Sequence, residues 1–540
     1  MDMSNEKREL MLNVNKIVIV GGGSAGWMTA AGLIKFFPEK EIVLVESPNV
    51  PTIGVGESTY DGIRHFCSLL EIDDKDFIAY TDASIKLGVS FADFYEKDDQ
   101  KFQYPFGAPY IENTKWGLED WMIKKVFYPE IPVNDFAESY FPQAHLANHN
   151  RFSENKNNEF GNFHPVLDTA FHFNALKFAS WLKERYCLPR GVKHILDDVL
   201  SVDVDDQGVS SLKMSSGNTI KSDLYVDCTG FKGLLITQAL KEPFTSYSHL
   251  LPNNSAWAAQ IEYKDKEKEL RSVTTCTALS NGWCWDTPLW SRLGSGYVYS
   301  DEFISDEDAL EEFKNYICSD KMAVARTREE AEALVYRNIK MRVGIHERVW
   351  VKNVVAIGLS AGFIEPLESN GLFTVYEFLY QLIRSMLRGP EVTQWDMDSF
   401  NHETKEIYNE FVDFIRIHYA LSIRQDSEYW IANSKRHYEF NKSNIEHKFS
   451  TGSSHLQRAK NRTFSPPLSG GGAWISSGLN YHILDELSVK LGELKNRMNY
   501  KIDLDPYFKE LDIKKDSWNK KALESPTMYE YIKNNFYNEQ

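Results

Sequence analysis

Short runs of apolar residues that end in glycine mark the strands that this chain is expected to form. KIVIV, within residues 15–20, is apolar and β-branched without polar alternation, which is typical of a parallel strand buried on both faces. A glycine turn and a helix rich in Ala, Leu, Met and Phe follow it, and EIVLVE at 41–46 has the pattern of a second strand. Strand, glycine turn, helix and strand in this order predict a βαβ unit.

The same patterns predict further elements along the chain. Residues 173–186 have the spacing of an amphipathic helix, and 198–205 and 208–214 are expected to pair as strands. Two more strands, at 222–230 and 350–358, end in glycine turns. Strands, glycine turns and helices that alternate in this way are typical of the α/β class.

Farther along the chain the spacing of apolar residues becomes that of helices. Between Leu372 and Met386 they recur near one stripe of a helix. From about residue 393 onward the chain is expected to be mostly helical, with a loop at 465–472 (SPPLSGGG).

Composition narrows the class of protein. The 540 residues carry a formal net charge of −17, which argues against a nucleic-acid or anionic-membrane partner. No apolar stretch approaches the roughly 18 residues of a membrane span, and the charged N-terminal residues lack the pattern of a secretion signal. The six cysteines form no CxxC pair, so neither a disulfide scaffold nor a metal site is expected. A soluble, cytoplasmic protein is predicted.

A glycine motif follows the first strand. Gly21, Gly23 and Gly26 form GxGxxG, and Glu46 closes the next strand twenty residues after the last of them. In dinucleotide-binding proteins the glycines allow close backbone approach, the helix N-terminus attracts pyrophosphate, and the acid accepts hydrogen bonds from ribose hydroxyls. We therefore expect a dinucleotide site here, the alternative being a plain packing turn.

Two segments also match the GxSxG pattern of a hydrolase nucleophile. They place Ser24 and Ser360 between a strand and a helix, where such a nucleophile lies. The glycine motif and Glu46 explain the first segment better, and no acid and histidine partner the second from sequence alone. A hydrolase is thus the weaker interpretation.

Two later glycine turns indicate which dinucleotide is bound. VDCTGFKG, at 226–233, resembles the second flavin contact of glutathione-reductase-like FAD proteins, and AIGLSAGF, at 356–363, resembles the third. Leu359 departs from that pattern, because aspartate is usual there. No second GxGxxG exists for NAD(P)H. We therefore expect FAD in its reduced form, FADH2, supplied by a separate flavin reductase.

Several segments together resemble the flavin-dependent tryptophan halogenases. The segments are GGGSAGWM at 21–28, PTIGVGEST at 51–59, SIKLGVSF at 84–91, GWCWDTP at 282–288 and GFIEPLESNGL at 362–372, with further support from 171–182 and 413–430. The resemblance covers about residues 15–430. The family signature WxWxIP is imperfect here, because Thr287 stands where isoleucine is usual.

The resemblance implies a glutathione-reductase-like, Rossmann-type FAD module with an interleaved, mainly helical substrate domain. The FAD module is assigned to residues 1–100, 165–240 and 340–392. The substrate part is assigned to 101–164, 241–339 and 393–540.

The resemblance also implies the reaction. Reduced FAD, oxygen and a halide form hypohalous acid, which travels through a tunnel to an aryl site where a lysine holds or delivers it. That lysine falls on Lys86, for which a solvated lysine on a polar strand face is the ordinary alternative. The family's essential glutamate falls on Glu368 and takes a proton from the ring, whereas Glu365 is expected to be structural.

Other residues follow from the same resemblance. The halide is assigned to Asn370 and Gly371, although the family typically has threonine where Asn370 stands. The residues assigned to FAD are Gly21, Gly23, Ser24, Ala25, Gly26, Glu46, Gly54, Val55, Gly56, Glu57, Ser58, Gly358 and Leu367. The residues assigned to substrate are Tyr104, Phe106 and Trp474, and those assigned to a barrier between substrate and flavin are Trp283 and Trp285.

The substrate is expected to be a small, electron-rich arene of the tryptophan, indole or phenol type, because aromatic side chains stack on such rings. Two other functions compete: a flavin monooxygenase that hydroxylates its arene, and a catalytically silent FAD-binding protein. Relatives are often homodimers, so a homo-oligomer is expected.

Overall fold

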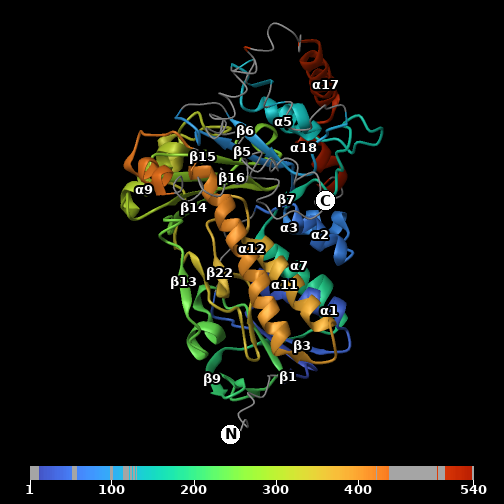
Figure 1. Ribbon diagram of the computed structural model, residues 1–540, viewed down its shortest axis with the longest axis vertical. Coiled ribbons are helices and arrows are strands. Elements are labelled where there is room, and N and C mark those ends of the chain that lie inside the picture. The colour runs from blue at the N-terminus through green and yellow to red at the C-terminus, as the bar shows by residue number, and fades with distance from the viewer. Residues whose placement is uncertain are drawn as a thin grey trace. The chain divides into compact units, whose positions relative to one another are not determined.

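The computed structural model describes residues 11–50, 58–97, 101–112, 121–436 apart from 122, 123, 126, 127, 129 and 421, residue 496, and 505–537. The chain forms two compact units, each built from three segments (Figure 1). The first unit contains Met1–Thr81, Phe173–His249 and Arg342–Asn409. The second contains Asp82–His172, Leu250–Met341 and Glu410–Gln540.

A six-stranded sheet forms the centre of the first unit. Its strands, in spatial order, are β20 (Trp350–Val351), β21 (Val354–Ala356), β12 (Leu224–Asp227), β2 (Lys16–Val20), β3 (Glu41–Glu46) and β8 (Lys193–Leu196). All neighbours pair in parallel except β20 with β21. The middle strands are buried on both faces, as their unbroken apolar sequences predict.

Helices and short turns connect and cover these strands. They are α1 (Ser24–Phe36), α2 (Gly62–Leu69), α3 (Asp74–Thr81), α7 (Ala175–Trp181), η1 (Leu182–Cys187), η2 (Leu188–Arg190), η3 (Gly230–Lys232), η4 (Leu234–Ala239), η5 (Gly358–Ser360), α11 (Gly371–Leu387) and α12 (Gln394–Ala420), which continues into the second unit. Helices α1 and α11 pack side by side (Figure 1). The N-terminus of α7 is capped by Asn174, whose side chain accepts from the backbone of Leu176 and Lys177.

Three small sheets complete the first unit. They are β9 (Val199–Asp205) with β10 (Gly208–Met214) and β11 (Thr219–Ile220); β13 (Phe244–Ser246) with β19 (Gly344–His346) and β22 (Gly362–Phe363); and β1 (Met11–Leu12) with β23 (Val392–Thr393). The predicted pairing of 198–205 with 208–214 is thus present as β9 and β10.

A seven-stranded sheet forms the centre of the second unit, which the sequence analysis expected to be mainly helical. In spatial order its strands are β18 (Arg337–Lys340), β14 (Ser255–Glu262), β17 (Arg292–Tyr299), β16 (Gly282–Pro288), β15 (Val273–Ala278), β5 (Gly88–Ala92) and β6 (Phe102–Pro105). Only β5 and β15 pair in parallel. One face of the sheet packs on α9 (Asp306–Ile317) through a cluster that includes Tyr297 and Phe313.

The second unit also contains a two-stranded sheet and further helices. The sheet pairs β4 (Ser84–Lys86) with β7 (Ala170–His172). The helices are α5 (Asp135–Tyr140), α6 (Pro142–Asn148), α8 (Lys266–Glu269), α10 (Arg328–Glu332), α17 (Asp505–Glu524), α18 (Met528–Ile532) and η6 (Lys533–Tyr537). No helix in the described part of the chain is both long and apolar enough to cross a membrane.

The last helices pack against the strand that carries Lys86. Ile85 and Leu87, on either side of that lysine, belong to one hydrophobic cluster with Trp518, Met528 and Ile532. A group of four charges ties α17 to the same unit, with Lys515 2.5 Å from Asp135 and Lys124 2.7 Å from Asp512. The C-terminal helices therefore form part of the core under β4.

The strand predicted over 350–358 is wrong, and the segment SIKLGVSF is divided in a similar way. The strand predicted over 350–358 is two short antiparallel strands, because the chain reverses at Lys352, whose φ is 54°. The segment SIKLGVSF is likewise split: β4 pairs with β7, whereas β5 joins the seven-stranded sheet. Residues 82–100, which the sequence analysis assigned to the FAD module, consequently lie in the second unit. The loop predicted at 465–472 lies outside the described residues.

We predict that Trp518→Ala lowers the stability of the second unit by about 3–5 kcal/mol, because it leaves a large cavity in the cluster under β4. Trp518 is 4% exposed and lies edge-on to Tyr110 at 5.6 Å. Ile513 on the same helix is 62% exposed, so Ile513→Ala is the matched control and should change stability by less than about 0.5 kcal/mol. Equal effects of the two variants in urea unfolding would contradict this packing.

Candidate functional site

The glycine loop after β2 is held close to its neighbours. The backbone N–H of Gly21 donates to the carbonyl of Val45 at 2.8 Å. A Cβ at Gly26 would lie 1.9 Å from the carbonyl oxygen of Gly21, so only glycine fits. Helix α1 then begins with Gly23 as its N-cap, and no side chain caps it. The N–H groups at its first turn, which includes Ser24 and Ala25, are those that bind an anion in dinucleotide sites.

Glu46 lies beside this loop, at the end of β3. A Cβ on Gly22 would be 2.3 Å from the Glu46 carboxyl carbon, so the loop and the carboxylate are in close contact. Its Oε2 accepts from Nε2 of His194 at 2.8 Å and lies 3.5 Å from Nζ of Lys183. Burial lowers the pKa of His194, so the ring is neutral and protonated on Nε2. These contacts orient the Glu46 carboxylate beside the loop, where an acid that binds ribose is expected.

The second glycine turn is organised by Asp227, which the sequence analysis did not select. Its carboxylate accepts from the backbone and hydroxyl of Thr229 at 3.0 and 2.6 Å. It also accepts from the backbone of Leu235 and Ile236 at 2.7 and 2.9 Å, at the start of η4. An aspartate at a strand end followed by Thr-Gly is a recognisable turn signal, and it was available in the sequence.

The third glycine turn contacts the first. A Cβ at Gly358 would lie 2.9 Å from the Cβ of Ala25, so the two turns meet. The two candidate nucleophiles are engaged in structural bonds: Ser24 Oγ donates to the carbonyl of Ala175 at 3.1 Å, and Ser360 Oγ donates to that of Ile357 at 3.0 Å. These bonds give no support to the hydrolase interpretation.

The start of α11 is the candidate halide site. Ser369 has φ 57°, and its hydroxyl donates to Ser58 Oγ at 2.9 Å. Asn370 is buried and is the N-cap, but its amide donates back to the Glu365 carbonyl at 3.3 Å instead of capping the helix. Among the residues that the structure describes, no atom lies within 4 Å of a Cβ placed on Gly371. This helix N-terminus thus has room for an anion, as the prediction for halide requires.

These features fit reduced FAD in the first unit. The glycine turns meet where a dinucleotide approaches the backbone, Glu46 lies beside them, and Leu367 is buried next to Glu368 in the segment before α11. Glu365 and Glu368 are both completely buried. The assigned residues Gly54, Val55, Gly56 and Glu57 lie outside the described residues.

Helix α11 also carries a carboxyl with a raised pKa. Glu377 is half-buried and forms no hydrogen bond or ion pair with another described residue. Burial raises its pKa to about 7.

Lys86 is buried in the second unit, which excludes the solvated alternative. Its exposed fraction is 0%, and its Nζ lies 5.1 Å from the centre of the Phe106 ring. The residue paired with it across the sheet is Ala170, a small side chain that leaves room for the lysine. The ammonium therefore lies against an aromatic face, which attracts a cation.

Aromatic rings continue from this contact. Tyr104 and Phe106, both predicted for substrate, lie edge-on at 6.3 Å, and Phe414 of α12 lies 6.0 Å from Tyr104. The sequence analysis missed Phe414, because nothing in the helical pattern of α12 distinguishes this ring from core. Trp474, the third residue predicted for substrate, lies outside the described residues.

The two signature tryptophans share one face of the seven-stranded sheet. Trp283 is buried and Trp285 is half-buried, with ring centres 6.3 Å apart. Trp285 lies across Gly296 of β17, where a Cβ would be 2.1 Å from its ring. Across β15 they pair with Ala278 and Cys276. Because the side chains of these partners are small, this face of the sheet has room for the indole rings.

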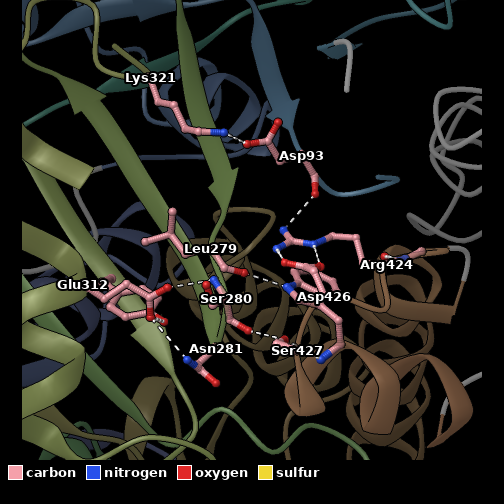
Figure 2. Close-up of polar contacts among 12 residues, drawn as sticks. Asp93, Leu279, Ser280, Asn281, Glu312, Lys321, Arg424, Asp426 and Ser427 are labelled. Atoms are coloured by element: carbon pink, nitrogen blue, oxygen red, sulfur yellow. Dashed lines mark hydrogen bonds and ion pairs between the residues drawn. The ribbon is translucent and has the colours of Figure 1, made fainter. Parts of the chain in front are cut away.

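Segment 422–430 fixes the turn that precedes these tryptophans (Figure 2). Trp430 Nε1 donates to the carbonyl of Leu279 at 2.6 Å, and Ser427 Oγ donates to that of Ser280 at 2.5 Å. Arg424 is buried, forms two 2.8 Å bonds with Asp426 and donates to the carbonyl of Asp93 at 3.0 Å. The β15–β16 turn is therefore held by hydrogen bonds from the third segment of the same unit.

Within the described ranges, no cluster of three or more His, Cys, Asp or Glu side chains is arranged to hold a metal ion.

Comparison with known proteins yields one family. The family model for tryptophan halogenase matches residues 16–470. The chain is 35% identical over 439 residues to tryptophan 6-halogenase SttH from Streptomyces toxytricini, covering 77% of this chain and 80% of that protein.

Solved structures are similar over almost the whole chain. The apo structure of VirX1 has a TM-score of 0.84 at 35% identity and covers 97% of this chain and 100% of that one. BrvH, a flavin-dependent halogenase from Brevundimonas sp. BAL3, has a TM-score of 0.79 at 28% identity and covers 97% and 99%.

The raised pKa of Glu377 predicts a pH dependence of stability. Between its ordinary pKa of 4.5 and about 7 the folded chain holds a proton that the unfolded chain has lost, so stability falls as pH rises through this window and then levels off. Glu377→Gln should remove that fall, which amounts to at most about 3 kcal/mol. Urea unfolding at pH 5 and 8 measures it, and the same pH dependence in both proteins would contradict the prediction.

Proposed function

The chain belongs to the tryptophan halogenase family, and from this premise we propose that it uses reduced FAD, oxygen and a halide to halogenate an electron-rich arene at Lys86. The observation that carries the proposal is the burial of this lysine against Phe106. A buried ammonium that has no functional role is unfavourable for stability, because its charge is removed from water.

The predicted fold class and the flavin requirement are confirmed by the likeness to flavin-dependent halogenases. Bound in its reduced form, FAD would supply hypohalous acid from oxygen and halide. The residues that would hold it are the glycine turns, Glu46 and the segment before α11. The N–H groups at the start of α11, at Asn370 and Gly371, would hold the halide.

Lys86 activates the oxidant in this proposal. Its ammonium donates a hydrogen bond to the oxygen of hypohalous acid, which makes the halogen more electrophilic. Ring electrons attack the halogen, the oxygen–halogen bond breaks, and the oxygen takes a proton from Lys86 and leaves as water. The carbon–halogen bond forms, and the ring is left as a cation.

Glu368 completes the reaction by accepting the ring proton, which restores aromaticity. Its proton then returns to the neutral amine of Lys86. The sum is arene plus hypohalous acid giving haloarene plus water. Complete burial favours this task, because a buried carboxylate attracts a nearby cation more strongly than an exposed one does.

The substrate class is proposed from the aromatic side chains next to Lys86. Tyr104, Phe106 and Phe414 offer faces and edges on which an indole or phenol ring stacks. A separate flavin reductase supplies the reduced cofactor, and a homodimer is expected as in relatives.

A panel of indoles, phenols and anilines tests the function. Each is offered with enzymatically reduced FAD, oxygen and chloride, bromide or iodide, and products are identified by mass spectrometry. Haloarene on at least one ring class is expected. A hydroxylated arene, formed without regard to halide, would instead establish the monooxygenase alternative.

We predict that Lys86→Met abolishes haloarene formation, by at least about 10²-fold, because it removes the donor to the oxidant. Methionine keeps the length and burial, so flavin oxidation and release of free hypohalous acid should remain. The free energy of unfolding should not fall, because a buried charge is replaced by an apolar chain. Haloarene formation at the wild-type rate would remove Lys86 from the mechanism.

Glu368→Gln is predicted to slow haloarene formation by about 10²–10⁴-fold through loss of the base, with flavin oxidation unchanged. The matched control is Glu365→Gln, three residues earlier and equally buried, which should leave the ring reaction nearly unchanged. Rates come from single-turnover reactions with one arene. If both variants are impaired equally, Glu368 acts through the structure of this segment and not as a base.

A further inference from the structure

His172 lies on the same sheet face as Lys86. In the β4–β7 pair His172 is opposite Ser84 and Ala170 is opposite Lys86. Residues opposite one another, and residues two apart on one strand, share a face of the sheet. His172 and Lys86 are therefore diagonal neighbours, and both have an exposed fraction of 0%.

Hydrogen bonds fix the proton of His172 to one nitrogen. Ser84 Oγ is 2.5 Å from the carbonyl oxygen of Pro288, which can only accept, so the serine hydrogen points there. Ser84 Oγ must then accept from Nδ1–H of His172 at 3.1 Å. Nε2 of the neutral ring is left as an acceptor, and Thr274 Oγ1 donates to it at 2.9 Å. Every group in this network is satisfied only when Nδ1 carries the proton.

The hydrogen-bond network connects β4, the lysine strand that carries Lys86, to the seven-stranded sheet, the tryptophan sheet that carries Trp283 and Trp285. Ser84 is on β4, His172 on β7, Thr274 on β15 and Pro288 at the end of β16. Thr274 is two residues before Cys276, which pairs with Trp285, so both side chains are on the tryptophan face of β15. One imidazole thus connects the strand of Lys86 to the face that carries Trp283 and Trp285.

The imidazole of His172 also remains neutral beside the positive charge of Lys86. Burial and the positive charge of Lys86 hold the pKa of His172 well below its usual range. Since the imidazole is neutral, it adds no second positive charge beside the ammonium.

We propose that His172 is a positioning residue for Lys86, which holds the ammonium where hypohalous acid meets the arene by bonding Ser84 of the lysine strand and Thr274 of the tryptophan sheet. The inference rests on the proposed function. It adds to that function the group that orients the lysine.

Three variants test the role. His172→Phe keeps a ring and removes both bonds; His172→Asn keeps a donor where Nδ1 lies; Thr274→Val removes the donor to Nε2 without changing the shape. The control is His145→Phe, because His145 is buried in the same unit and, among the described residues, its ring bonds the carbonyl of Glu138 on α5 and not β4 or β15. Each variant is checked for folding by thermal unfolding.

The measured quantity is the share of the oxidant that ends in haloarene, compared with the share released as free hypobromous acid. With bromide and one accepted arene, haloarene and trapped free hypobromous acid are measured per oxygen consumed. His172→Phe should lower haloarene per oxygen about 10- to 100-fold, with a matching rise in free hypobromous acid and no change in flavin oxidation. Thr274→Val should lower it about 3- to 10-fold, and His172→Asn should recover part of the loss. An unchanged division in folded His172→Phe or in Thr274→Val overturns the proposal, as does an equal loss in His145→Phe.

A second measurement separates this proposal from the proposed function. In ¹⁵N spectra, His172 should be neutral with its proton on Nδ1 at pH 6, and Lys86→Met should raise its pKa. A wild-type chain that halogenates no arene but shows these spectra would end the proposed function and keep the coupling of His172 to Lys86. Spectra with the proton on Nε2, or a pKa unmoved by Lys86→Met, would end the inference.

Discussion

A positive charge removed from water at Lys86 is the constraint on which the second unit depends. A buried ammonium is unfavourable unless its surroundings compensate. The face of Phe106 attracts the charge, Ala170 leaves room for it, and the neutral ring of His172 adds no competing charge. In the proposed reaction this ammonium donates a hydrogen bond to a small neutral oxidant.

The first unit, in contrast, presents groups that favour negative charge. Its glycine turns and helix N-termini present backbone N–H groups, which favour anions, and we propose the pyrophosphate of a dinucleotide at α1 and a halide at α11. Glu46 lies where an acid would bind the ribose, and His194 and Lys183 hold its carboxylate in place. The groups that favour anions and the buried lysine therefore lie in different units of one chain.

Local patterns were predictable and long-range pairings were not. β3 was predicted with its correct ends, and the glycine motif with its close approach, because each depends on residues near in sequence. The break at Leu87 was not predictable, because it arises where the backbone N–H of Leu87 bonds the distant carbonyl of Ser272. His172 was missed for the same reason: its bond to Ser84 spans 88 residues. The resemblance implied that Lys86 is the site, but only the structure shows what surrounds it.

The central claim is that oxygen leaves the reaction as water at the lysine, while the halogen goes to the ring. Labelling with ¹⁸O₂ tests this most directly, with bromide and an accepted arene present and products weighed by mass spectrometry. The account predicts a brominated arene that contains no ¹⁸O. An arene that carries ¹⁸O in place of bromine would contradict it.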